Sequence, residues 1–157
     1  MKAASLNELQ KELSTHPPKR ILEICIRLAK YKKENKELLT YLLFEAHDEA
    51  NFIKNIKEET EAQFREMTKS NIYLAKKSIR KILRTINKFS RYSGLKETEA
   101  DLRIHYCKQL KNSGIPIYSS KVVTNLYNNQ LKKINHVISG LHEDLQYDYR
   151  RELQELE

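Results

Sequence analysis

Hydrophobic residues recur along the chain at the three- and four-residue spacing of amphipathic helices, in six stretches. Leu6, Leu9 and Leu13 predict a first helix over 5–14, which Ser5 and Glu8 begin with a capping box. The Pro17-Pro18 pair stops this helix. The same spacing predicts the remaining helices, over 18–33, 36–67, 71–92, 96–112 and from about Ser120 to near the C-terminus.

The stretch 18–33 has the widest apolar surface. Its apolar residues cover about 200° of the helical wheel, which leaves only a narrow polar stripe. A helix of this kind packs on more than one side, so we expect it at the centre of the fold. Cys25 lies in the apolar arc and is interpreted as a buried small hydrophobic residue rather than a reactive thiol.

Three features predict how the later helices bend and pair. The short Thr68-Lys69-Ser70 link predicts an antiparallel hairpin between 36–67 and 71–92. Gly140 marks a bend or a close crossing in the last helix. That helix also has an alternating four- and three-residue seam, which fits packing along 36–67 or, as the less favoured alternative, a homodimer. The seam consists of Tyr127, Leu131, Ile134, Ile138, Leu141 and Leu145.

The composition fits a single all-α domain over residues 1–157. The chain has 157 residues with only 3 Gly and 3 Pro, too few for the many tight turns of an all-β fold. We therefore expect five to six helices, arranged as a helical bundle or as a short right-handed α–α superhelix. The helix 36–67 and helix 71–92 hairpin forms its base, and the last helix lies alongside.

The first three predicted helices resemble the helix pairs of HEAT and armadillo-type repeats. The resemblance covers residues 5–67 and depends on the proline pair and on leucines of the second and third helices, Leu22, Leu28, Leu39, Leu42 and Leu43. It implies a right-handed superhelix with a scaffold or binding role, and it implies no particular functional residues.

The positive charge is concentrated in one segment. The formal net charge is +8, and residues 69–94 contain eight Lys or Arg and no Asp or Glu, whereas the flanking segments are each neutral. Such a local excess marks a place where an anion could dock.

On the helical wheel of 71–92 the cationic residues occupy one broad arc beside the apolar face, with Tyr73 in its middle. We interpret this arc as a polyanion-binding surface for a nucleic acid or an acidic protein, with no enzymatic activity. Arg grips phosphate bidentately and Tyr73 can stack on a base. The alternative is a structural or protein–protein interaction domain whose basic face is solvated or paired internally. The candidate residues are Tyr73, Lys76, Lys77, Arg80, Lys81, Arg84, Lys88 and Arg91.

Catalytic and cofactor motifs are not apparent in the sequence. The three glycines, Gly94, Gly114 and Gly140, make no phosphate-binding loop, and the five histidines lack metal-site spacings. We therefore expect no cofactor and no metal. The start of the chain lacks the apolar stretch of a secretory signal, no transmembrane run is present, and two cysteines are too few for a disulfide scaffold. A cytoplasmic location is expected.

Overall fold

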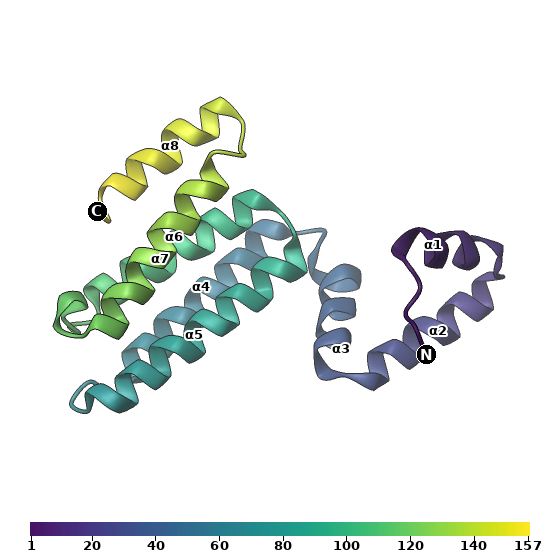
Figure 1. Ribbon diagram of the computed structural model, residues 1–157, viewed down its shortest axis with the longest axis horizontal. Coiled ribbons are helices and arrows are strands. Elements are labelled where there is room, and N and C mark those ends of the chain that lie inside the picture. Colours follow the sequence, from purple (N-terminus) through teal and green to yellow (C-terminus); the bar gives the residue numbers. More distant parts are fainter. The chain divides into compact units, whose positions relative to one another are not determined.

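The computed structural model describes the backbone of residues 1–157 and every side chain except that of Ser119. Its regular elements are all helical, so the all-α fold class is confirmed (Figure 1). The chain divides into two compact units, Met1–Phe44 and Glu45–Glu157. The α-helices are α1 (Leu6–Thr15), α2 (Pro18–Tyr31), α3 (Lys33–Thr40), α4 (Glu49–Glu66), α5 (Ile72–Ser93), α6 (Lys96–Asn112), α7 (Lys121–Ile138) and α8 (Glu143–Gln154).

The predicted count of five to six helices is wrong, because two long helices are interrupted. The stretch 36–67 is divided into the last five residues of α3, a π-helical turn at Tyr41–Glu45, and α4. Asp48 begins α4, since its side chain accepts a hydrogen bond from the Asn51 backbone N–H. A short carboxylate that satisfies a free helical N–H favours a new helix start over continuation.

The last predicted helix is interrupted at residues 139–142, between α7 and α8. Gly140 lies in this break, which confirms a bend there. A Cβ at residue 140 would lie 2.6 Å from the Lys96 Nζ, and this Nζ also donates to the Gly140 carbonyl. The close approach of Lys96 therefore suits a residue without a side chain.

The N-terminal unit has almost no interior. The predicted capping box of Ser5 and Glu8 is present, and α2 packs against α3. Among residues 1–44, however, only Tyr41 is buried, and Cys25 is half-buried. The prediction that 18–33 forms the central helix is therefore wrong, because none of its apolar residues lies in the interior of the chain.

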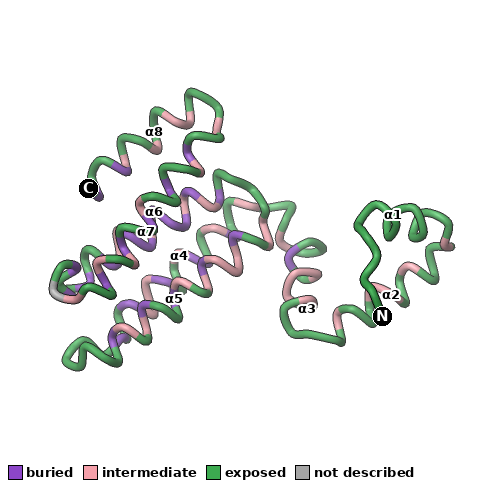
Figure 2. Tube along the Cα trace, in the orientation of Figure 1, coloured by how far each residue is buried: buried purple, intermediate pink, exposed green. Residues whose placement is uncertain are grey.

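The centre of the C-terminal unit is α6. It packs against α4 and α5, and also against α7 and α8. Figure 2 shows buried positions along its length. Its side chains at Leu102, Tyr106 and Leu110 are fully buried. A helix that is buried on several sides needs apolar or paired side chains around most of its circumference, unlike a surface helix with one apolar face.

The predicted antiparallel hairpin is formed by α4 and α5 (Figure 1). Asn71 caps α5 by accepting from the backbone N–H groups of Tyr73 and Leu74. Gly94 ends it with a φ of 69°, a left-handed conformation that favours glycine. These two caps define both ends of the helix that carries the positive charge.

The seam of the last predicted helix packs inside the chain, against a different partner from the one expected. Tyr127, Ile134 and Ile138 are buried, and α7 packs on α6 rather than along 36–67. The Tyr127 hydroxyl donates to the Leu156 carbonyl over 2.8 Å. These three seam residues are therefore covered within the chain.

Shortening a core side chain of α6 tests its central position. Leu102 is 0% exposed, so Leu102→Ala should lower the free energy of unfolding by about 2–5 kcal/mol. Leu74→Ala is the matched control, because Leu74 is 42% exposed and its truncation leaves no internal cavity. Urea unfolding followed by circular dichroism measures both. Equal losses for the two variants would contradict a core centred on α6.

The pH dependence of stability tests the α4–α6 contact. Burial of His105, and then the charge of Lys57, lowers the pKa of this histidine despite the nearby Glu61 and Asp101. The native state therefore resists protonation, while the unfolded chain takes up the proton near pH 6.5. Burial of the neutral His105 ring therefore costs no stability above pH 6.5, and the native state loses stability relative to the unfolded chain as the pH falls below it. His105→Gln should reduce the stability difference between pH 7.5 and 5.5, and an unchanged difference would contradict the assignment.

Candidate polyanion-binding groove

A depression follows α5 and continues between α5 and α7. Its first part has a volume of about 540 Å³ and its walls come from α5 alone. The second part, of about 630 Å³, lies between α5 and α7, and both parts share Arg80 and Leu83. We call this depression the cationic groove. Its lining residues are Tyr73, Lys76, Lys77, Arg80, Leu83, Arg84, Asn87, Val122, Asn125, Leu126, Asn129, Gln130, Lys132 and Lys133.

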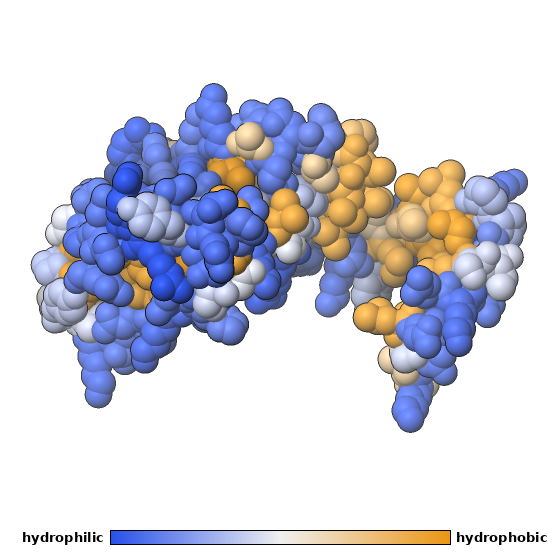
Figure 3. Space-filling view, turned by 90° about the horizontal axis from the view of Figure 1, so that it is seen from above, coloured by the Kyte–Doolittle hydropathy of each residue, from blue (hydrophilic) through white to orange (hydrophobic). Residues whose placement is uncertain are grey.

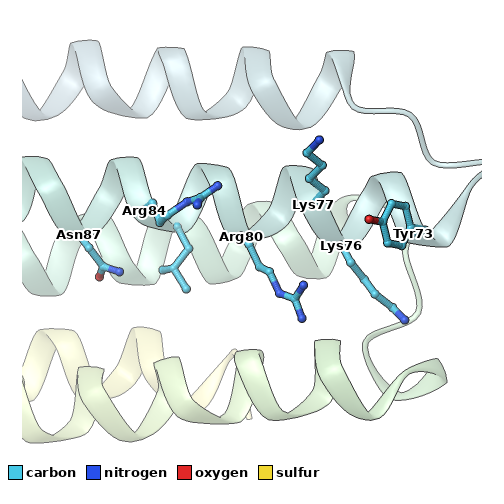
Figure 4. A pocket seen from close by; sticks show the side chains of 7 residues that line it. Tyr73, Lys76, Lys77, Arg80, Arg84 and Asn87 are labelled. Atoms are coloured by element: carbon cyan, nitrogen blue, oxygen red, sulfur yellow. The ribbon is translucent and has the colours of Figure 1, made fainter.

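The packing of α6 explains why the groove exists. Both α5 and α7 pack on α6, so their outward surfaces are held on either side of the depression. In Figure 4, Lys76 and Arg80 extend from α5 toward the pale green α7, and Lys77 points away from it. Tyr73 stands at the beginning of α5 with 74% of its surface exposed. The basic side chains thus line an open surface rather than an enclosed cavity.

Five of the eight candidate residues line the cationic groove, namely Tyr73, Lys76, Lys77, Arg80 and Arg84. The other three do not. Lys81 and Arg91 are exposed outside it, and Lys88 is half-buried with its Nζ 4.9 Å from the centre of the Phe89 ring. The helical wheel of 71–92 places all eight residues in one arc, because it gives only the direction of each side chain around the helix axis. It does not show which of these side chains neighbouring helices cover.

The opposite wall of the groove comes from α7 and was missed by sequence reasoning. It adds the cations Lys132 and Lys133 and the amides Asn125, Asn129 and Gln130. The sequence does contain a signal, because amides and lysines cluster within 125–133. Their significance depends on α7 lying across from α5, which no local pattern reveals. Among the described lining residues, none is an Asp or Glu.

Acidic residues at the contacts of α6 with its neighbouring helices pair with cations outside the groove. Lys57 of α4 donates to Asp101 of α6 over 2.6 Å, and Lys108 of α6 donates to Glu152 of α8 over 2.7 Å. In contrast, six basic residues of α5 form no ion pair with any carboxylate that the structure describes. They are Lys76, Lys77, Arg80, Lys81, Arg84 and Arg91.

A buried arginine links α6 to the α7 wall. The Arg103 guanidinium donates to Glu99 from its Nε over 2.8 Å and to the Gln130 Oε1 from its Nη1 over 2.6 Å. Arg103 is only 6% exposed, and Glu99 balances its charge. Because Gln130 also lines the cationic groove, this interaction holds one wall in place and orients a groove amide.

The strongest pKa shifts belong to core residues outside the groove. Burial raises the pKa of the Cys107 thiol to about 12 and that of the Tyr127 hydroxyl to about 12. Burial also raises the pKa of Tyr106. Among the side chains that the structure describes, no three His, Cys, Asp or Glu gather as a metal site requires. None of the described helices combines the length and apolar character needed to cross a bilayer.

No model of a known protein family matches the chain, and neither a curated protein nor a solved structure shows significant similarity to it. The resemblance of residues 5–67 to HEAT and armadillo-type helix pairs therefore stays a prediction.

Removing the buried arginine tests the α6–α7 link. Arg103→Met leaves the Gln130 carbonyl oxygen without its donor, so it should lower the free energy of unfolding by about 1–3 kcal/mol. Lys108→Met is the control, because its pair with Glu152 is partly exposed and contributes at most about 1 kcal/mol. Urea titration of both proteins measures the difference. A larger loss for Lys108→Met would contradict the structural importance of Arg103.

Proposed function

We propose that the protein is a non-enzymatic binding module that docks the phosphate backbone of a nucleic acid in the cationic groove. The observation that carries this proposal is a groove with six Lys or Arg in its lining and no acidic residue among the described lining side chains. A polyanion supplies the missing negative charge, and the release of its counterions supplies affinity.

The spacing of the cations suits a repeating anion. Lys76, Arg80 and Arg84 lie at four-residue intervals on α5, which places one cation about every 6 Å along the helix axis. Phosphates of a stacked strand repeat about every 3.4 Å, so roughly every second phosphate meets a cation. Lys132 and Lys133 add positive charge from the α7 side. Contacts of this kind position the sugar–phosphate backbone of a nucleic acid and do not depend on its base sequence.

The uncharged lining favours a nucleic acid over an acidic protein. Asn87, Asn125 and Asn129 can donate to and accept from base edges, and the exposed Tyr73 ring offers a stacking surface. A protein interface is instead centred on well-packed aromatic or Arg anchors surrounded by contacts that exclude water. The apolar lining is limited to Leu83, Val122 and Leu126. An acidic protein partner is the second candidate, favoured by the same charge.

The salt dependence of binding tests the electrostatic contribution. With about three phosphate contacts to a single strand, a threefold rise in salt should weaken binding roughly tenfold. Fluorescence anisotropy with labelled single-stranded and duplex oligonucleotides, from 50 to 450 mM NaCl, measures the slope. Polyglutamate serves as the acidic-protein probe. Absence of oligonucleotide binding at 50 mM salt would rule out the nucleic-acid proposal, and binding of polyglutamate alone would favour the second candidate.

Charge reversal tests the position of the site. The triple variant Lys77→Glu, Arg80→Glu, Arg84→Glu should abolish binding, since it replaces three groove cations with repelling carboxylates. A control with the same charge change reverses exposed residues of α4 and α8 outside the groove, Lys54→Glu, Arg65→Glu and Arg151→Glu. The control should retain most of the affinity, and both variants should keep the helical circular dichroism signal. Equal losses would show that overall charge, rather than the cationic groove, governs binding.

A further inference from the structure

A row of positive charge follows one wall of the cationic groove. Lys76, Arg80 and Arg84 stand at four-residue intervals on α5, and all three line the groove. Between its first and last lining residues on α5, Tyr73 and Asn87, the helix rises by about 21 Å. The nucleotides of one stacked strand repeat about every 3.4 Å, so this length matches about six nucleotides.

The wall that α7 contributes has a different chemistry. It presents the exposed amides of Asn125 and Asn129, and its two lysines, Lys132 and Lys133, lie further along the helix. An amide donates as well as accepts hydrogen bonds, and the edges of bases do the same, whereas the oxygens of a phosphodiester only accept. The α7 amides therefore match the bases of a nucleic acid better than its backbone.

Three apolar side chains also line the groove. Leu83 belongs to both of its parts, and Val122 and Leu126 line the second part. The flat faces of bases can pack on apolar side chains once the bases are unstacked from one another. Three residues are too few for the centre of a protein interface. Most of the large exposed apolar side chains instead belong to residues 1–44, over which Figure 3 shows them gathered.

Tyr73 offers a stacking surface at the beginning of α5. Its side chain is mostly exposed, and Figure 4 shows its ring beside the first turn of the helix, with Lys76 and Lys77 extending to either side. Among the described residues, no other aromatic ring packs on it. Stacking on this ring needs a base whose face is not covered by a neighbouring base pair, and a single strand supplies such bases.

A double helix suits this groove less well. Proteins read the bases of a duplex by inserting a helix or a two-stranded ribbon into its major groove, which is about 12 Å wide. In contrast, α5 packs against α4 and α6, and its cations line a depression rather than a ridge. Base pairing also occupies edges that the α7 amides would contact. The geometry of the groove therefore favours an unpaired strand.

We infer that the cationic groove binds about six nucleotides of a single-stranded nucleic acid, with the phosphates along α5 and the bases turned toward Tyr73 and the α7 amides. This inference rests on the proposed function, and it adds which form of nucleic acid binds and which wall faces the bases. The chemistry recognised is an unpaired base on a phosphodiester chain, which single-stranded RNA and single-stranded DNA share.

Charge alone would produce the opposite preference. Duplex DNA carries one negative charge per about 1.7 Å of its axis, against one per about 3.4 Å for either strand. A surface that attracts only phosphates therefore binds a duplex more tightly than a single strand of equal length. Preference for the single strand requires contacts with bases, and this difference separates the inference from the proposed function.

Fluorescence anisotropy with three ligands, each of twelve sugar–phosphate units per strand, tests the inference. They are an unstructured pyrimidine strand, the duplex of that strand with its complement, and a strand of abasic sites. We expect the pyrimidine strand, in at least one of its RNA and DNA forms, to bind roughly tenfold more tightly than either of the others. If the duplex or the abasic strand binds as tightly, the inference is overturned and the proposed function stands. If none of the three binds, both are wrong.

Substitution of Tyr73 tests the stacking contact. Tyr73→Ala should weaken binding of the pyrimidine strand about tenfold and leave the abasic strand unaffected, because the ring stacks on a base and not on a phosphate. Tyr73→Phe retains the ring and should bind like the unaltered chain. Tyr147→Ala is the matched control, because Tyr147 is exposed on α8 outside the groove. The inference is contradicted if Tyr73→Ala binds the pyrimidine strand like this control, or if it loses affinity for both ligands equally.

A second pair of variants tests the α7 amides. The double variant Asn125→Ala, Asn129→Ala should weaken binding of the pyrimidine strand about fivefold or more, since two hydrogen-bonding groups are lost. The control Asn128→Ala, Asn135→Ala removes two exposed amides of the same helix that do not line the groove, and it should bind like the unaltered chain. All four positions are exposed, so both variants should keep the helical circular dichroism signal. Equal affinities of the two variants would overturn the assignment of the bases to the α7 wall.

Discussion

Burial of α6 on several sides is the constraint on which the rest of the C-terminal unit depends. Its side chains at Leu102, Tyr106 and Leu110 are fully buried, and the helix packs against α4 and α5 as well as α7 and α8. Because α5 and α7 share this one partner, the positions of their outward residues are coupled through it. The cationic groove is a consequence of this shared packing, and Arg103 reinforces it by joining α6 to Gln130. A function that needs both walls therefore depends on a helix that has no residue in the groove lining.

The distribution of acidic residues matters as much as that of the cations. Asp101, Glu99 and Glu152 pair with Lys57, Arg103 and Lys108 around α6, where partial burial strengthens their interactions. These carboxylates pair around α6, and six basic residues of α5 form no ion pair with a described carboxylate. The local excess of positive charge is thus preserved by folding, because the ion pairs that stabilise the helix contacts form elsewhere.

The two units bury apolar surface in different ways. The C-terminal unit encloses its core within the chain, whereas the N-terminal unit has wide apolar arcs and almost no buried residue. From the sequence, 18–33 was the better candidate for a central helix, since its apolar residues outnumber those of 96–112. The charged side chains of α6 concealed its burial, because Arg103 is paired and Lys108 contacts Glu152 with much of its length covered. Apolar content measures the tendency of a helix to be buried, and the availability of partners determines which helix is buried.

The helical fold class, the capping box of Ser5, the bend at Gly140 and the position of the basic segment all followed from the sequence. Each depends on residues within about four positions of one another, where hydrogen bonds and periodicity act. The central position of α6 and the α7 wall of the groove did not follow from it, and neither did the break at Asp48, although the hydrogen bond that begins α4 there is local. The position of α6 and the α7 wall depend on contacts between residues far apart in the chain, such as Arg103 with Gln130. Local patterns carry no information on which helices lie side by side. The sequence therefore predicted eight binding residues, of which only five line the groove, and it did not predict the second wall.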